Sequence, residues 1–364
     1  MDLAQDSSEE GSRGSVAGVR RGVSASAFKQ AKRLGLIHVT AEALSIRRLR
    51  HGKGFRYVDR AGAPIRDPAV LQRLKSLAVP PAYEDVLYAA QANAHLQALG
   101  RDAAGRLQYR YHPEWEKVRE LRKARRLAAL AEALPKIRRT VGRCLAGAEP
   151  CREFALAAVI ELVARTAIRP GDEGHTRFSG NRGATTLLKS NVAVAEGMVT
   201  LRFRAKGGKK VAKQVAAPRL CEALAALLRL PGRRLFQYRS QGGEIRAVTA
   251  RSVNTFLREM AGAPISLKDF RTLLASVTVL DVLSRETPAN SKRARRRQVL
   301  QAIRLAAEDL ANTPAICARS YVHETVISAF EEGVLDSFAE TLRSTRSKAR
   351  REKVLGEVVA AAAG

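Results

Sequence analysis

The chain has 364 residues, and its 64 Lys and Arg side chains against 35 Asp and Glu give a formal net charge of +29 at pH 7. This excess of cations is far larger than solubility requires, and it predicts a polyanionic partner, with nucleic acid ahead of a membrane surface. No apolar run approaches the roughly 18 residues that span a bilayer, and the amino terminus lacks an apolar signal core, which predicts a soluble, intracellular protein.

The amino-terminal third is predicted to be a tail followed by a strand-rich domain. Residues 1–26 are rich in Ser, Gly and Arg and have no hydrophobic period, so we expect a disordered tail. Residues 27–117 contain short alternating runs between turns, and Asp67-Pro68 is typical of a helix start. Near the end of this domain Tyr109 and Tyr111 share one strand face. In a chain with 5% aromatic residues this pair indicates either a surface that packs on sugar and phosphate or strand aromatics that face a core.

Residues 118–343 are predicted to form a larger, mostly helical domain. A charged helix over 116–139 carries an apolar stripe of Leu121, Leu127, Leu130 and Leu134. An apolar helix over 153–168 is expected to be buried, and it ends at Arg169-Pro170-Gly171, which holds an arginine at a fixed turn.

Strand patterns follow that turn, and helices follow the strands. We expect strands over Gly183–Leu188 and Met198–Arg204, and the second leads into a Lys- and Gly-rich hairpin tip that begins at Lys206. Further helices follow, and residues 344–364, which are first basic and then Ala-rich, are expected to be a frayed tail.

No cofactor is indicated by the spacing of the metal- or nucleotide-binding residue types. No lysine of the Gly-rich stretches is followed by a hydroxyl, as ATP-binding phosphate loops require. The six histidines contain no H-x-x-x-H pair, and no C-x-x-C pair occurs among the cysteines, which are Cys144, Cys151, Cys221 and Cys317. We therefore expect chemistry without metal and without ATP.

The stretch Leu310–His323 contains the candidate nucleophile. It places Tyr321 after a short Asn312-Thr313-Pro314 turn. A phenol with a pKa near ~10 attacks a phosphodiester poorly at neutral pH, so it needs cations around the phosphate and an acid for the leaving oxygen. Candidates elsewhere are Arg169 at a helix end, Lys206 on a hairpin tip and Arg271 at a helix start.

In this order and context the motifs resemble the poxvirus-like and bacterial type IB DNA topoisomerases. The motifs that carry the likeness are Ile168-Arg169-Pro170-Gly171, Phe203-Arg204-Ala205-Lys206, Leu267-Lys268-Asp269-Phe270-Arg271-Thr272, Asn312-Thr313-Pro314 and Ser320-Tyr321-Val322-His323. The amino-terminal domain adds Leu77–Tyr83 and Gly105–His112, so the likeness covers roughly residues 30 to 340. It implies an α+β fold, with a small strand-rich DNA-clamp domain before a mostly helical catalytic domain of the tyrosine recombinase and type IB topoisomerase kind, which includes a small sheet and hairpin.

The resemblance also implies a reaction and its residues. Tyr321 would form a 3′-phosphotyrosyl link to duplex DNA, Arg169 and Arg271 would bind the nonbridging oxygens, and Lys206 would protonate the leaving 5′-oxygen. Asn312 stands where many relatives have histidine. Because an amide does not act as an acid near neutral pH, only a hydrogen bond from Asn312 to phosphate is expected. The implied enzyme relaxes supercoils without ATP or metal, and it is expected to be a monomer, associated with the nucleoid.

Several positions keep two interpretations. Lys209 and Lys210 compete with Lys206 for the acid role, His175 is either a phosphate contact or a solvent-exposed loop residue, and Lys268 either touches phosphate or caps its helix. Family position marks as DNA contacts Gln108, Tyr109, Tyr111, His175 and Lys268.

Two other functions compete with this one. A tyrosine recombinase shares the tyrosine chemistry, but an H-x-x-R pattern before the second arginine and a Gly-His pair upstream of the tyrosine are typical of such enzymes. This chain has Lys268 three residues before Arg271, and Ala311-Asn312 in place of Gly-His. A nonenzymatic DNA binder would explain the charge alone, without the order of the motifs.

Overall fold

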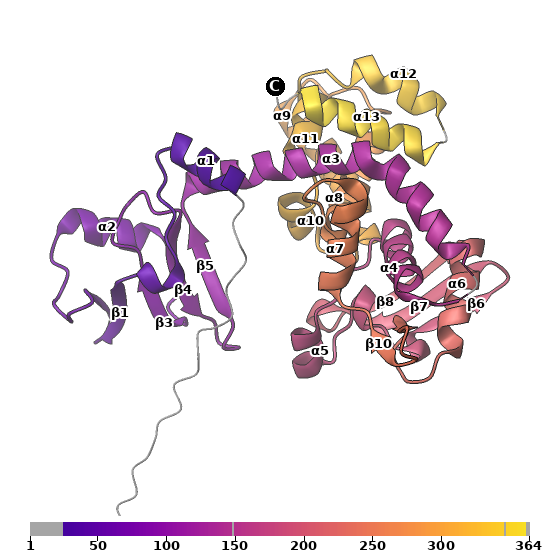
Figure 1. The fold of residues 1–364 in the computed structure, drawn as a ribbon. Coiled ribbons are helices and arrows are strands. Elements are labelled where there is room, and N and C mark those ends of the chain that lie inside the picture. The colour runs from indigo at the N-terminus through magenta and orange to yellow at the C-terminus, as the bar shows by residue number, and fades with distance from the viewer. Residues whose placement is uncertain (1–24, 148, 346, 362–364) are drawn as a thin grey trace, which may run out of the picture. The chain divides into compact units, whose positions relative to one another are not determined.

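The computed structural model describes residues 25–147, 149–345 and 347–361, without the side chains of residues 25–28, 175 and 361. The chain forms two compact units, which divide between Arg119 and Glu120 (Figure 1). Residues 1–24 of the predicted tail lie outside the described residues, and helix α1 (Ala25–Arg33) begins within the range predicted for that tail. Within the described residues, no helix combines the length and the apolar content needed to cross a membrane.

The first unit is a five-stranded antiparallel sheet with short helices. Asp67 begins α2 (Pro68–Ser76), as the sequence predicts, because its carboxylate accepts a hydrogen bond from Ala69 N at 2.8 Å and Pro68 fits the first helical turn. The strands, in the order β2-β1-β3-β4-β5, are β1 (Ile46–His51), β2 (Gly54–Val58), β3 (Glu84–Tyr88), β4 (Leu96–Arg101) and β5 (Leu107–Tyr111).

A long helix, α3 (Pro113–Leu145), follows β5 and contains the boundary between the units. Three of the four leucines of the predicted stripe, Leu127, Leu130 and Leu134, are buried in the core of the second unit. Leu121, the fourth, is exposed, so the stripe begins one to two turns later than predicted.

The second unit is mostly helical, and its core surrounds α4 and α8. These two helices are apolar on nearly every side, which is why they are central rather than amphipathic surface helices. The helices after α3 are α4 (Arg152–Thr166), α5 (Glu173–Ser179), α6 (Pro218–Arg229), α7 (Ala250–Ala261), α8 (Leu267–Leu283), α9 (Lys292–Asp309), α10 (Pro314–Ser320), α11 (Glu324–Glu331), α12 (Asp336–Ser344) and α13 (Lys348–Ala361). The predicted α+β class, with a strand-rich domain before a larger helical one, is confirmed.

The second unit also contains a small antiparallel sheet, in the order β6-β7-β8, and a separate two-stranded hairpin. The strands are β6 (Val192–Ala195), β7 (Met198–Arg204), β8 (Lys210–Ala216), β9 (Gln237–Arg239) and β10 (Ile245–Ala247). The strand predicted over Gly183–Leu188 is wrong, since Ala184–Thr186 is a 3₁₀ turn. The reason is that the amides of Ala184 and Thr185 donate to the carbonyls of Arg169 and Pro170 at 2.7 and 2.8 Å, rather than to a neighbouring strand.

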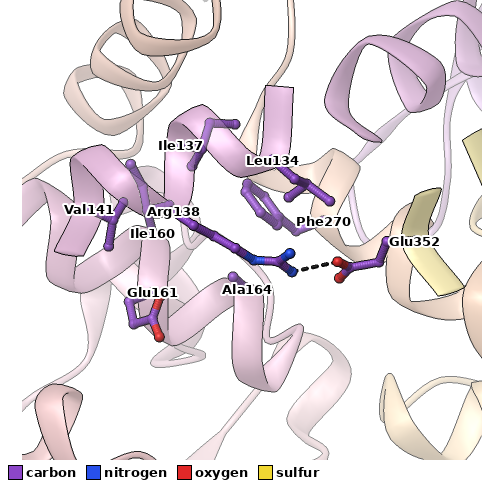
Figure 2. A pocket seen from close by; sticks show the side chains of 9 residues that line it. All are labelled: Leu134, Ile137, Arg138, Val141, Ile160, Glu161, Ala164, Phe270 and Glu352. Carbon is purple, nitrogen blue, oxygen red and sulfur yellow. Dashed lines mark hydrogen bonds and ion pairs between the residues drawn. The ribbon is translucent and has the colours of Figure 1, made fainter. Parts of the chain in front are cut away.

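The predicted frayed tail at the carboxyl terminus is also wrong. Within it, α13 packs beside α12 and buries Val354, Leu355, Val358 and Val359, a helical apolar stripe that the surrounding charges hide in the sequence (Figure 1). Glu352 is only 2% exposed and pairs with Arg138 at 2.5 Å beside a cavity of about 30 Å³ between α3, α4, α8 and α13 (Figure 2). Helix α13 is therefore part of the core of the second unit.

Candidate active site

Tyr321 directly follows α10, and cationic side chains lie close to its ring. The helix begins at Thr313, whose hydroxyl accepts from Ile316 N at 3.3 Å, and Pro314 occupies its first turn. The tyrosine is 8% exposed, its ring centroid is 4.7 Å from the Arg271 guanidinium carbon, and the Lys268 ammonium is 5.8 Å away.

These cations change the acidity of the phenol. Burial on its own would raise the pKa of Tyr321, but the charge of Arg271 and its hydrogen bond to the phenol, together with the charges of Arg169 and Lys268, lower the pKa below its ordinary value. The phenolate is therefore easier to reach near neutral pH than that of a free tyrosine.

Arg271 is almost completely buried, at 1% exposure. Its Nη1 donates to the carbonyl of Ala167, and its Nη2 donates to the carbonyl of Leu310 at 3.1 Å. Burial lowers the pKa of Arg271, and the neighbouring Tyr321 opposes that shift. Two backbone carbonyls thus hold the guanidinium between the segments that lead to Arg169 and Asn312.

The amino-terminal end of α8, which carries Arg271 and Lys268, is fixed from α3. Ser266 and Asp269 form a capping box, in which the Asp269 carboxylate accepts from Ser266 N at 2.7 Å. Arg126 of α3 donates to the same carboxylate at 2.7 Å and to the Ser266 hydroxyl at 2.8 Å. Since Ser266 and Asp269 cap the helix, the structure does not support the interpretation of Lys268 as the cap. Lys268 is exposed, and its ammonium lies 5.8 Å from the centroid of the Tyr321 ring.

Arg169 and Asn312 are brought together although 143 residues separate them, with Arg169 Nη2 donating to Asn312 Oδ1 at 2.5 Å. A guanidinium can only donate, so the amide oxygen faces Arg169 and the amide nitrogen stays available as a donor. Asn312 Nδ2 and Arg271 Nε are both buried and have no hydrogen-bond partner in the described part of the chain. Five other buried side-chain atoms of the described residues also lack a partner, so the location of these two is what matters. Arg271 lies against the phenol and Asn312 contacts Arg169, where both donors suit the oxygens of a phosphate.

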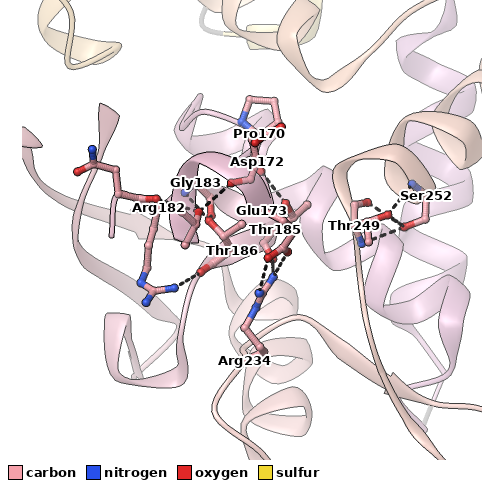
Figure 3. Close-up of polar contacts among 12 residues, drawn as sticks. Pro170, Asp172, Glu173, Arg182, Gly183, Thr185, Thr186, Arg234, Thr249 and Ser252 are labelled. Atoms are coloured by element: carbon pink, nitrogen blue, oxygen red, sulfur yellow. Dashed lines mark hydrogen bonds and ion pairs between the residues drawn. The ribbon is translucent and has the colours of Figure 1, made fainter. Parts of the chain in front are cut away.

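The turn that carries Arg169 is built on a close approach of two backbone segments. A Cβ at Gly183 would lie 2.4 Å from Gly171 N and 2.5 Å from Arg169 O, so only glycine fits there. Figure 3 shows the surrounding polar contacts: Arg234 binds the Glu173 carboxylate with two hydrogen bonds, at 3.0 and 2.6 Å, and also donates to Thr185 O at 2.6 Å. These contacts hold α5 and the Gly183 segment against the turn.

The backbone after Tyr321 is held by two side chains that sequence patterns did not indicate. The Ser276 hydroxyl of α8 donates to Tyr321 O at 3.3 Å and accepts from His323 N at 3.1 Å. Lys123 of α3 donates to Val322 O at 2.5 Å. Burial, assisted by the charge of Lys123, lowers the pKa of His323 to about 4, so this histidine is neutral at pH 7 and unsuited to donate a proton.

The predicted acid is not part of this cluster. Lys206 begins the short 3₁₀ turn Lys206–Gly208 between β7 and β8, and Lys206, Lys209 and Lys210 are all exposed. In the described part of the chain none of the three makes a hydrogen bond or ion pair with Tyr321, Arg169, Arg271 or Asn312. The hairpin tip predicted for Lys206 is confirmed, whereas its role as the acid stays a prediction.

In the first unit, the predicted DNA contacts lie on β5. Tyr109 and Tyr111 share one face, as predicted, with ring centroids 6.2 Å apart; Tyr109 packs partly on a small core, and Tyr111 is 36% exposed. Gln108 donates to the Asp102 carboxylate at 2.9 Å. Tyr109 therefore fits the core interpretation in part, whereas the contact of this face with DNA stays a prediction. The side chain of His175 lies outside the described residues, and its backbone is in α5.

Among the described residues, no group of three or more His, Cys, Asp or Glu side chains is arranged to hold a metal ion. Within the same part of the chain the anion-binding groups around Tyr321 are arginines, a lysine and an amide. The cluster thus offers positive charge and hydrogen-bond donors from its own side chains.

Comparison with known families covers most of the chain. Residues 54–102 match the bacterial DNA topoisomerase IB N-terminal domain, and residues 112–348, more than half of the chain, match the eukaryotic DNA topoisomerase I catalytic core. The chain belongs to the type IB DNA topoisomerase family. The DNA topoisomerase 1B of Acanthamoeba polyphaga mimivirus is 29% identical to it over 269 residues, which span 72% of this chain and 80% of the viral protein.

The family match confirms the resemblance drawn from the motifs, so this type IB topoisomerase is an isomerase whose substrate is DNA. The boundary between the two matches lies between residues 102 and 112, and the Tyr321 cluster lies entirely within the catalytic-core match.

The Gly183 contact gives a first testable prediction for the topoisomerase. Gly183→Ala should lower the free energy of unfolding by about 3 kcal/mol and slow DNA relaxation, because the new methyl displaces the turn that holds Arg169. Chemical denaturation and plasmid relaxation measure the two effects. Gly242→Ala is the matched control, since its Cβ meets no atom closer than 4.0 Å. Equal stability and activity of the two variants would contradict the prediction.

Proposed function

We propose that this enzyme relaxes supercoiled duplex DNA by transient cleavage of one strand, with Tyr321 as the nucleophile. The phenol oxygen forms a bond to a backbone phosphorus, and the bond from phosphorus to the 5′-oxygen breaks. The products are a 3′-phosphotyrosyl ester and a 5′-hydroxyl. Because the ester conserves the free energy of the broken bond, rotation and religation need no ATP. The cationic side chains beside Tyr321 take the place of a metal ion at the phosphate.

The observation that carries this proposal is the buried phenol among cations and unpartnered donors. Tyr321 lies beside Arg271, and the donors Arg271 Nε and Asn312 Nδ2 have no partner among the described groups. In the proposed complex these donors and Arg169 bind the nonbridging oxygens, where negative charge grows in the transition state. The lowered pKa of Tyr321 supports its role as the attacking group.

Lys206 is proposed to donate a proton to the departing 5′-oxygen. Its place on the exposed β7–β8 tip supports an acid that reaches the site when DNA binds, as the hairpin glycines Gly207 and Gly208, both in left-handed conformations, permit a mobile tip. Lys209 and Lys210 share the tip and remain the alternatives.

Further contacts to DNA are proposed on both units. Lys268 is proposed to contact the same phosphate region, which its distance of 5.8 Å from the Tyr321 ring supports, and Gln108, Tyr109 and Tyr111 are proposed as contacts from β5. His175 is proposed as a phosphate contact from α5 on family position. The enzyme is proposed to act as a monomer on the nucleoid, in the cytoplasm.

Relaxation in the presence of EDTA tests the proposal. The purified enzyme should relax positive and negative supercoils of two plasmids of unrelated sequence at comparable rates, without nucleotide, because its own side chains neutralise the phosphate. A strict requirement for Mg²⁺ or ATP would contradict the mechanism. Strand exchange confined to one sequence would instead indicate a recombinase.

A further inference from the structure

Lys213, on β8, is a half-buried lysine that the proposed reaction does not use. Its ammonium donates to the carbonyl of Thr166 at 2.8 Å and to the carbonyl of Asp309 at 2.5 Å. Thr166 is the last residue of α4, and Asp309 is the last residue of α9. The carbonyls at a helix end lack partners within the helix and carry partial negative charge, so one ammonium bridges two helix ends that would otherwise repel.

The next residues along both segments repeat this link. One position after Thr166 and Asp309, the carbonyls of Ala167 and Leu310 accept from Arg271. Two residues after Ala167 and Leu310, Arg169 Nη2 donates to Asn312 Oδ1 at 2.5 Å. Three successive links thus join the end of α4 to the end of α9, and Lys213 makes the first of them.

The backbone between these links is under local strain, so its position depends on such contacts. Ala167 and Ala311 both have φ of +49°, in the left-handed region that costs a non-glycine residue about 1 kcal/mol or more. Ala311 directly precedes Asn312, and Ala167 lies two residues before Arg169. A change in the spacing of the helix ends would therefore move Arg169 and Asn312.

Lys213 also anchors the hairpin that carries the proposed acid. It pairs in register with Leu201 of β7, on the strand that returns from the tip at Lys206. Burial lowers the pKa of Lys213, and the nearby Asp309 charge opposes that shift while Arg271 adds to it. The two cations, Lys213 and Arg271, lie close together and are separated by the carbonyls that they bind.

We infer that Lys213 is a positioning residue of the active site: it sets the spacing of the segments that carry Arg169 and Asn312 and ties the Lys206 hairpin to them. The inference rests on the proposed roles of these three residues. Within the described residues, the hydrogen bonds of the Lys213 ammonium all go to backbone carbonyls, so it acts through the others.

Lys213→Met tests the inference, since methionine has a similar length but no donor or charge. With excess enzyme, relaxation of supercoiled plasmid should slow about 10-fold to 100-fold, the effect expected when catalytic groups shift by about an ångström. Binding to a linear duplex should change less than about threefold, because no phosphate contact is removed. Lys213→Arg should keep the rate within about fivefold, since arginine can donate to both carbonyls.

Lys189→Met is the matched control. The Lys189 ammonium also donates to a helix-end carbonyl, that of Leu230 after α6, but makes no hydrogen bond with the Tyr321 cluster in the described part of the chain. This variant should relax DNA within about twofold of the wild type. A wild-type rate for Lys213→Met, or an equal slowing by both methionine variants, would overturn the inference.

A comparison of single and double variants of Lys213 and Asn312 distinguishes a positioning role of Lys213 from a general effect on stability. If Lys213 acts in part by placing Asn312, Lys213→Met should slow relaxation by a smaller factor in an Asn312→Ala background than in the wild type. Rate losses that multiply would show independent action and overturn the inference. If Lys213→Met does not fold, Lys213→Gln, which reaches one carbonyl, replaces it in the same comparisons. Failure of the wild type to relax DNA would refute the proposed function instead.

Discussion

Tyr321→Phe is expected to abolish DNA relaxation, with a loss of more than about 10⁵-fold, since the variant lacks the oxygen that forms the phosphotyrosyl bond. The covalent complex trapped by denaturant should vanish as well. DNA binding should persist, because the cations around the ring remain: Arg271 is held by backbone carbonyls rather than by the phenol alone. Plasmid relaxation, detergent trapping and a gel-shift assay measure the three quantities.

Tyr238→Phe is the control for the loss of one phenolic oxygen. Tyr238 is a half-buried tyrosine on β9 of the same unit. The Tyr238→Phe variant should relax DNA at the wild-type rate. Relaxation that survives in Tyr321→Phe would place the nucleophile elsewhere and would remove the basis for the roles of Arg169, Arg271 and Asn312.

Arg271→Lys is expected to have the second largest effect, a loss of about 10³-fold in the rate of strand cleavage. Lysine keeps the charge but loses the planar fork, so it cannot hold the Ala167 and Leu310 carbonyls and also present a donor to phosphate. The pKa of Tyr321 should rise toward its ordinary value, because the hydrogen bond from the Arg271 guanidinium, one of the effects that lower this pKa, is lost even though lysine keeps the charge. The optimum of the cleavage rate should therefore move to higher pH.

Arg138→Lys is the control for Arg271→Lys, because it makes the same exchange of arginine for lysine at a position away from Tyr321. Arg138 contacts Glu352 of α13 and lines the small cavity in Figure 2. Its exchange should leave the cleavage rate and its pH profile unchanged within about threefold, whatever it does to stability. Equal losses in both variants would show that Arg271 acts through folding alone.

The sequence predicted the members of the tyrosine cluster better than the contacts that hold it together. Tyr321, Arg169, Arg271 and Asn312 lie in motifs whose order is distinctive. The fold brings Tyr321 into contact with Arg271, and Arg169 into contact with Asn312, while their catalytic roles stay predictions. Lys213, Ser276 and Lys123 bind backbone carbonyls of distant residues. Every residue has a carbonyl, so no pattern in the sequence marks which one a lysine or serine will reach.

Two errors in the predicted fold have related physical causes. The segment after Gly183 has the composition of a strand, but tertiary hydrogen bonds to the Arg169 turn override that propensity. The last helix, α13, was hidden because its charged residues dominate the composition, although its four buried apolar residues repeat with helical spacing. In both places the deciding partner lies outside the segment itself, in the Arg169 turn for the first and in helices such as α8 for the second.

Mapping of the covalent intermediate tests the central claim most directly. The enzyme is mixed with supercoiled plasmid in EDTA, denatured during turnover and digested with protease and nuclease, and the peptide that carries a nucleotide is sequenced by mass spectrometry. The account predicts one modified peptide, with the nucleotide joined through its 3′-phosphate to Tyr321. A nucleotide on another residue, or a link through a 5′-phosphate, would contradict it.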